Sequence, residues 1–153
     1  MSIPADTRLL KVCRLLNEAG AKYLVAGAYA MILNDAIRAT QDVDVLIEES
    51  LENYQRVIDG LSRLADGAAA ELTPQDFVEN VVVKIADEVE VDVSTRAWKV
   101  SYADAFPNAQ RLVIQDVEIP YLSREDLILS KQTYRDQDRV DVELIRRRQH
   151  GEF

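Results

Sequence analysis

The pattern that most constrains this chain is a pair of aspartates in an otherwise apolar strand, residues 41–47 (QDVDVLI). Because side chains alternate across a strand, Asp42 and Asp44 share one face while the valines enter the other. Neighbouring carboxylates repel each other and lose hydration when partly buried, so a fold keeps them together where a cation compensates. Magnesium, which prefers carboxylate oxygens, is the natural compensating ion. The alternative is a solvated strand edge with two ordinary aspartates.

The segment in front of this strand predicts a phosphate-binding turn. Residues 23–26 are a short apolar run that ends at Gly27, as a buried strand does before a turn. Residues 28–37 have apolar side chains close to the helical period of 3.6. We therefore expect Gly27 and Ala28 at a helix N-terminus, where free N–H groups and the helix dipole favour a phosphate.

A second alternating segment, residues 89–94 (VEVDVS), supplies a third carboxylate. Its valines take one face of the expected strand, and Asp92 lies on the other. A hairpin with residues 80–86 is expected to bring Asp92 back beside the Asp42 strand. Three carboxylates gathered there can hold two metal ions about 3.5–4 Å apart, which activate an attacking oxygen and stabilise a leaving phosphate.

The order of these motifs resembles the nucleotidyltransferase superfamily typified by DNA polymerase beta. The matching elements are Gly27-Ala28, residues 38–44 (RATQDVD) and Asp92 on a later strand. Within the superfamily, the resemblance is to small stand-alone members from toxin–antitoxin and abortive-infection systems, and to members that adenylylate antibiotics. The chain departs from the family at Ala28, where a glycine or serine is common. This change keeps a backbone N–H contact to phosphate but removes a hydroxyl contact.

The C-terminal segment extends the resemblance, which covers residues 23–145. Lys131 ends an apolar stretch, and Arg135, Asp138 and Asp141 follow it, as in the closing motif of the small members. In relatives the lysine helps to hold the nucleotide phosphates, and the resemblance implies this role for Lys131. The alternative is a solvated helical lysine. The spacing also allows Asp138 to position Lys131 or Arg135.

The resemblance implies a magnesium-dependent nucleotidyltransferase that moves a nucleoside monophosphate from a nucleoside triphosphate such as ATP to a hydroxyl group, with release of pyrophosphate. Asp42 and Asp44 would bind two metal ions, and Asp92 would bind the catalytic ion and draw the proton from the attacking hydroxyl or hold it in line. Arg38 either neutralises phosphate charge or pairs with the acidic cluster. The residues implied to contact or flank the nucleotide are Gly27, Ala28, Arg38, Thr40 and Lys131.

The acceptor hydroxyl stays open among an RNA end, a protein and a small molecule. A cognate toxin or antitoxin protein is a further expected partner. The alternative function is a weakly active or inactive nucleotidyltransferase-fold antitoxin that binds a partner protein, which Ala28 and the short, acidic chain favour.

The fold class expected from these segments is α/β (α+β): a small mixed β-sheet flanked by helices, with a C-terminal helix that closes the site. The 153 residues fit a single domain, 1–153, without a linker. Residues 68–75 are expected to form a loop, in which Pro74 acts as the breaker of regular structure. The aromatic residues of the irregular segment 96–109, Trp98 among them, either border a substrate cleft or pack against the sheet edge.

Composition narrows the function classes further. The net charge of −9 argues against broad binding of nucleic acid, because such binding relies on lysine and arginine. No apolar run approaches the ~20 residues of a membrane span, and the N-terminus lacks the features of a signal peptide, so a cytoplasmic protein is expected. The single histidine, His150, argues against a histidine-centred triad or zinc site.

Overall fold

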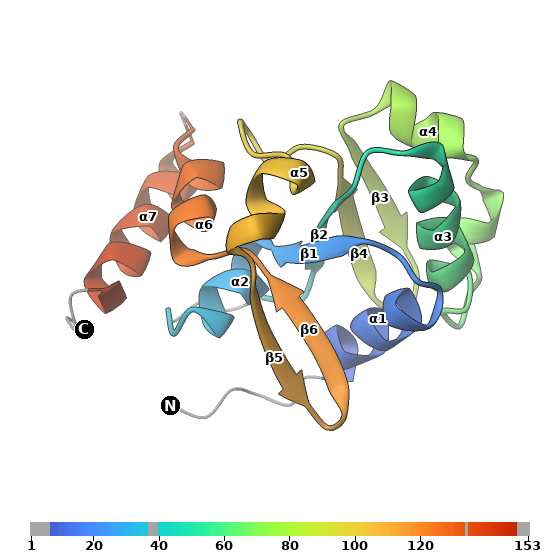
Figure 1. Ribbon diagram of the computed structural model, residues 1–153, viewed down its shortest axis with the longest axis horizontal. Helices are drawn as coiled ribbons and strands as arrows, with labels where there is room; N and C mark the ends of the chain where they lie inside the picture. The colour runs from blue at the N-terminus through green and yellow to red at the C-terminus, as the bar shows by residue number, and fades with distance from the viewer. Residues whose placement is uncertain (1–6, 37–39, 134, 150–153) are drawn as a thin grey trace.

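A computed structural model describes residues 7–36, 40–133 and 135–149 of the chain. Within these residues the chain forms one six-stranded mixed sheet with helices around it (Figure 1). The strands are β1 (Tyr23–Ala26), β2 (Val43–Ile47), β3 (Val82–Ala86), β4 (Glu90–Ser94), β5 (Gln110–Ile114) and β6 (Val117–Tyr121). The α-helices are α1 (Thr7–Glu18), α2 (Gly27–Leu33), α3 (Leu51–Leu61), α4 (Pro74–Glu79), α5 (Tyr102–Ala105), α6 (Arg124–Lys131) and α7 (Asp136–Gln149). Two short 3-10 helices are η1 (Ala68–Glu71) and η2 (Phe106–Asn108).

The strand order is β3-β4-β2-β1-β6-β5, so the two strands with the predicted carboxylates are neighbours. β2 runs antiparallel to β1 and parallel to β4. This register places Asp44 opposite Ala26 on one side and opposite Asp92 on the other. The α+β fold class is confirmed, as is the hairpin of β3 and β4 that delivers Asp92.

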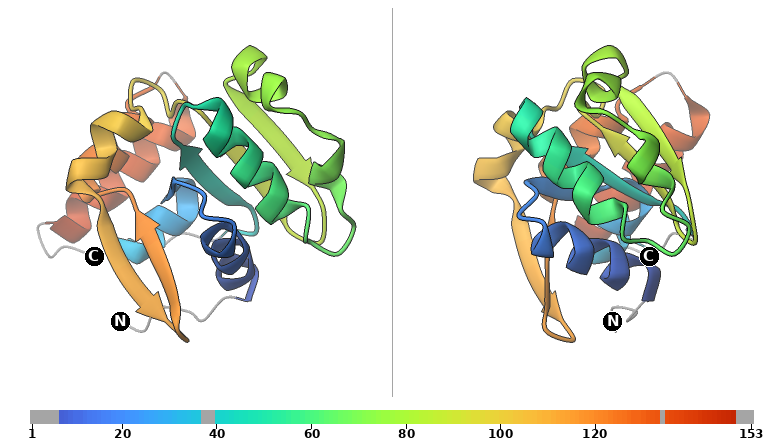
Figure 2. Two further views of the ribbon diagram at one scale, coloured as in Figure 1. Left: turned by 45° about the vertical axis from the view of Figure 1, so that its right-hand side comes forward. Right: turned by 90° about the vertical axis from the view of Figure 1, so that its right-hand side faces the viewer.

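The two faces of the sheet have different roles. The Tyr23 hydroxyl donates to Asn17 Oδ1 at 2.8 Å, so the side of β1 that holds Tyr23 faces α1. The side-chain alternation places Val45 on this face as well, and Asp44 on the opposite one. α1 and α3 pack together, whereas α2 contacts β2 and α6 (Figure 2). The alternation therefore points Val43, Val45 and Ile47 of β2 toward the face that α1 covers and places Asp44 on the opposite face.

The expectation of a loop over residues 68–75 is wrong, because η1 and the start of α4 occupy this segment. Thr73 and Asp76 form a capping box, in which the Thr73 N–H donates to Asp76 Oδ2 at 2.8 Å. Pro74 lies in the first turn of α4, where backbone N–H groups have no partner within the helix, so the N–H that proline lacks costs no hydrogen bond. Proline here begins a helix instead of breaking one.

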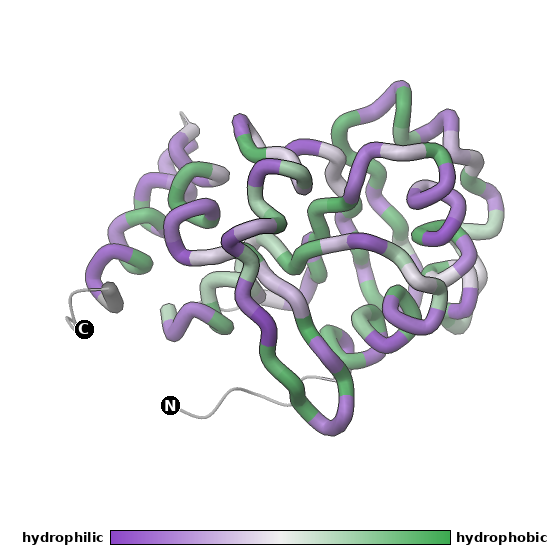
Figure 3. Tube along the Cα trace, viewed as in Figure 1, coloured by the Kyte–Doolittle hydropathy of each residue, from purple (hydrophilic) through white to green (hydrophobic). Residues whose placement is uncertain are grey.

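The C-terminal region consists of two helices, because α6 ends at Lys131 and α7 begins at Asp136. α7 packs on α6 and is largely hydrophilic along its length (Figure 3). No helix in the described ranges combines the length and the apolar character that a membrane crossing requires.

Candidate active site

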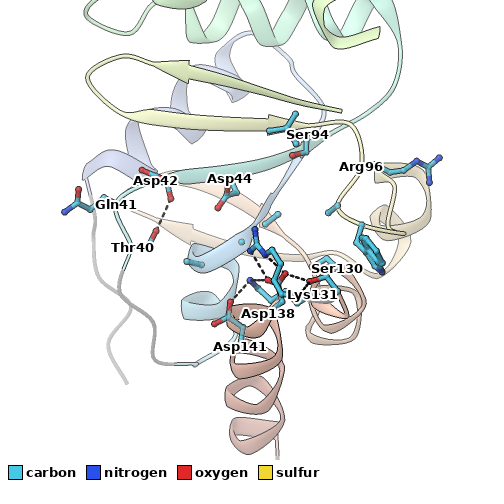
Figure 4. Close-up of a pocket in the computed structure, with 18 residues that line it drawn as sticks. Thr40, Gln41, Asp42, Asp44, Ser94, Arg96, Ser130, Lys131, Asp138 and Asp141 are labelled. Carbon is cyan, nitrogen blue, oxygen red and sulfur yellow. Dashed lines mark hydrogen bonds and ion pairs between the residues drawn. The ribbon is translucent and has the colours of Figure 1, made fainter. Parts of the chain in front are cut away.

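A cleft of about 830 Å³ opens on the carboxylate face of the sheet, between the β1–α2 turn, the start of β2, the β4–α5 loop and the α6–α7 region (Figure 4). Most of the residues that the sequence predicted for the site line it together. These are Gly27, Ala28, Thr40, Asp42, Asp44 and Lys131. Asp92 is absent from the cleft wall and lies beside Asp44 on the neighbouring strand. Arg38 lies outside the described residues.

Gly27 allows the β1–α2 turn to pack directly against Asp44. Its φ of +61° lies in the left-handed region that favours glycine. A Cβ atom at this position would lie 2.1 Å from Asp44 Oδ2, closer than any real contact allows. Any larger residue would therefore displace the Asp44 carboxylate, so the glycine is required by the site and not only by the turn.

Asp44 and Asp92 form a close carboxyl pair. Burial, the charge of Asp92 and a hydrogen bond with it together raise the pKa of Asp44 to about 7, against the opposing charge of Lys131. Asp92 Oδ1 is buried and has no hydrogen-bond partner among the described residues. The nearest cation, Lys84 Nζ, is 3.7 Å from it and more than half exposed. Asp44 therefore lacks a closely paired cation that would keep its carboxylate ionised at neutral pH.

This donor set suits a hard divalent cation such as Mg²⁺. Carboxylate oxygens are its preferred protein ligands, and the buried Oδ1 of Asp92 accepts no hydrogen bond from the described residues. Among the described residues, however, no group of three or more histidine, cysteine, aspartate or glutamate side chains is gathered closely enough to hold a metal ion. The three-carboxylate site of Asp42, Asp44 and Asp92 therefore stays a prediction.

Lys131 is a buried, paired lysine, unlike the solvated helical lysine of the alternative interpretation. Only 9% of its surface is exposed, and its Nζ lies 2.8 Å from Asp141 Oδ2 and 3.7 Å from Asp138 Oδ1. Asp141 is fully buried, and its other oxygen accepts a hydrogen bond from Gln137 Nε2 at 2.8 Å. Because Lys131 still lines the cleft, its ammonium is fixed in position at the cleft wall.

Asp138 lies between Lys131 and Arg135 and contacts both, which confirms the contacts expected from the sequence spacing. Arg135 donates to it twice, from Nε at 2.9 Å and from an Nη at 3.1 Å. The Thr133 hydroxyl donates to the same carboxylate at 2.5 Å. The cluster thus balances Lys131 and Arg135 against Asp138 and Asp141, where the end of α6 meets the first turns of α7.

Several cleft residues escaped the sequence analysis. Ser94 lies two residues after Asp92 on the same strand face, so the alternation contained a signal for it. Ser130 and Thr133 have no sequence signal beyond their nearness to Lys131. Trp98 lines the cleft, so for this one residue of its segment the interpretation as a cleft aromatic holds. Tyr102 of that segment instead stacks on another aromatic ring, that of Phe106.

The cleft lining has more carboxylates than cationic groups. The aspartates are Asp42, Asp44, Asp138 and Asp141, and the cationic residues are Arg96, Lys131 and Arg135. Both Lys131 and Arg135 already have carboxylate partners. A polyanionic ligand is therefore expected to need added cations in order to enter this cleft.

The stability of the protein should fall as the pH rises through the titration of Asp44. Its pKa is about 7 in the folded chain and near the ordinary 3.8 when unfolded, so between these values the folded state holds a proton that the unfolded state releases. The free energy of unfolding therefore decreases from about pH 4 to about pH 7, by ~2–4 kcal/mol. Denaturant titrations in the presence of a chelator should show this slope in the wild type. Asp44→Asn should flatten it, and an equal slope in both proteins would contradict the assignment.

Comparison with known proteins adds independent findings. Residues 7–146 match a family described as nucleotidyltransferase of unknown function (DUF6036). The chain is also similar to a crystal structure of the lincosamide antibiotic adenylyltransferase LnuA in its lincomycin-bound form, with a TM-score of 0.57, 13% identity, and coverage of 95% of this chain and 98% of that one. An antigenic nucleotidyltransferase-like protein from Paracoccidioides brasiliensis gives a TM-score of 0.53 and 18% identity, over 93% of this chain and 77% of that one. No curated protein sequence matches the chain.

Proposed function

Because the chain belongs to the family of nucleotidyltransferases of unknown function designated DUF6036, we propose that it transfers a nucleoside monophosphate from a nucleoside triphosphate to a hydroxyl acceptor. The observation that supports this reaction best is the arrangement of one cleft. The Asp44–Asp92 carboxyl pair lies beside the Gly27 turn, and the buried Lys131 lines the same cleft. Nucleotidyl transfer asks little covalent chemistry of a protein, so positioning and charge compensation provide the rate.

Asp42, Asp44 and Asp92 are the residues proposed to hold Mg²⁺. When bound there, the metal neutralises charge on the triphosphate and makes the acceptor hydroxyl easier to deprotonate. The cleft supports this dependence, because Lys131 and Arg135 are already paired with carboxylates and leave little positive charge to meet a triphosphate.

The chain's own residues have distinct proposed roles. The acceptor oxygen attacks the α-phosphorus, the bond from that phosphorus to the bridging oxygen of the β-phosphate breaks, and pyrophosphate leaves. Asp92, which shares a hydrogen bond with Asp44, accepts the proton of the attacking hydroxyl. Lys131 and the backbone N–H groups of Gly27 and Ala28 hold the outgoing phosphates, where their positive charge stabilises the transition state.

Two further residues of the prediction flank this arrangement. Thr40 lines the cleft, and its hydroxyl donates to the backbone carbonyl of Asp42 at 3.1 Å. This bond fixes the chain just before β2, so Thr40 helps to orient the predicted metal strand. Arg38 stays a proposed phosphate contact.

The acceptor classes are an RNA end, a protein and a small molecule. The similarity to an adenylyltransferase for a lincosamide antibiotic supports ATP as donor and a small hydroxyl compound as acceptor. A cognate toxin or antitoxin partner is proposed on the sequence resemblance alone.

Transfer is tested with triphosphates labelled at either end. The protein is incubated with Mg²⁺ and pools of candidate acceptors, and with ATP labelled at the α- or the γ-phosphate. The α-label should enter an acceptor while the γ-label appears only in pyrophosphate. Movement of the γ-label into an acceptor would identify a kinase instead and would refute the proposed reaction.

A further inference from the structure

Trp98 has an unusual backbone conformation in the loop between β4 and α5. Its φ is +59°, in the left-handed region that bulky side chains rarely occupy. The turn around it is closed by two backbone hydrogen bonds, from Ala97 N–H to Val100 O at 2.9 Å and from Val100 N–H to Ala97 O at 3.0 Å. The surrounding structure therefore holds a tryptophan where a glycine or asparagine would be less strained.

Other described residues with left-handed backbones provide a contrast. Asp35, Gln115 and Asp116 also have positive φ, but all three have polar side chains, and none lines the cleft. Trp98 does line it, and 43% of its surface is exposed. Local strain that a fold retains at a cleft points to a use for the strained side chain.

Trp98 is also the one aromatic side chain among the described residues that line the cleft. Its loop lies on the same side of Asp44 as the end of α6 in Figure 4, where Ser94 at the end of β4, Arg96 of the loop, and Ser130 and Lys131 of α6 are all to the right of Asp44. A nucleotide whose phosphates contact Lys131 would therefore enter the cleft that Trp98 borders.

We propose that Trp98 is the stacking platform for the base of the bound nucleoside triphosphate, a role that rests on the proposed function. Stacking on an aromatic ring tolerates any base, because every base presents a flat π-face. Its loss should weaken nucleotide binding by between about 5-fold and about 150-fold. Trp98 alone should therefore raise the affinity for all four triphosphates without selecting strongly among them.

The chain contains a single tryptophan, so fluorescence reports this position alone. Titration of the wild type with ATP and Mg²⁺ should quench the emission. Inorganic tripolyphosphate with Mg²⁺ should bind by calorimetry and leave the emission nearly unchanged, because it has no base. In calorimetry, Trp98→Leu should bind ATP about 5-fold to about 150-fold more weakly than the wild type and should bind tripolyphosphate equally well. Trp98→Phe keeps an aromatic ring and should retain most of the affinity for ATP.

A glycine variant separates the stacking role from a structural one. Trp98→Gly relieves the left-handed strain, so it should raise the melting temperature while weakening ATP binding as much as Trp98→Leu does. Asp116→Gly relieves a φ of +65° outside the cleft and should leave ATP binding unchanged. If the wild type and Trp98→Leu bind ATP with equal affinity, Trp98 is not a stacking platform. Binding of tripolyphosphate in the same experiment would still support the phosphate site. A wild type that binds neither ligand would overturn the proposed function and the platform with it.

Discussion

Asp44→Asn is expected to reduce nucleotidyl transfer by about 100- to 1000-fold, the usual cost of removing a group that stabilises charge in a transition state. The variant should remain folded and should gain stability above pH 7. Burial and the charge of Asp92 both raise the pKa of Asp44, so its ionised form is unfavourable in the folded chain. Transfer of the α-label and thermal unfolding measure the two effects on the same preparation.

Asp116→Asn is the matched control for this substitution. Asp116 is exposed in the β5–β6 turn outside the cleft, and asparagine also tolerates its left-handed backbone. This variant removes the same charge and should keep wild-type transfer. Full activity in Asp44→Asn would place the chemistry elsewhere in the molecule.

The second large effect is expected at Asp141. Asp141→Ala should lower the free energy of unfolding by about 3–5 kcal/mol, because it leaves the buried ammonium of Lys131 without its closest partner. The double variant Asp141→Leu/Lys131→Met should recover much of this loss, since it removes both charges. Urea unfolding of the three proteins measures the difference.

Asp136 on the same helix provides the control. Its side chain is 97% exposed and pairs with Arg139 at 3.6 Å, so solvent screens the interaction. Asp136→Ala should therefore change stability little. Equal effects of Asp136→Ala and Asp141→Ala would show that the buried pair contributes no more than a surface one.

The central strands and their carboxylates could be predicted because each obeys a local rule. The apolar run before Gly27 predicted β1, and the period-2 alternation around Asp44 and Asp92 put both carboxylates on matching strand faces. Their adjacency then required only that β2 and β4 pair. The burial of Lys131 had no such rule, since it depends on the chain turning between α6 and α7 so that Asp141 meets the lysine.

Two other features were not predicted, for different reasons. Pro74 acts as a helix breaker or a helix starter according to its position, and only the capping contact between Thr73 and Asp76 decides which. The turn at Trp98 has no glycine or asparagine to mark its left-handed residue, so sequence signals for turns do not find it. The first therefore had a local sequence signal, Thr73 and Asp76 at the spacing of a capping box, whereas the second had none.

The most direct test of the central claim is calorimetry of the four nucleoside triphosphates, with and without Mg²⁺, on the wild type and on Asp44→Asn/Asp92→Asn. A triphosphate should bind the wild type only when Mg²⁺ is present, because Lys131 and Arg135 of the cleft are already paired with carboxylates. The double variant should lose this binding. Wild-type protein that binds no triphosphate, or binds one equally without Mg²⁺ and in the double variant, would contradict a metal-dependent nucleotidyl-transfer site at these carboxylates.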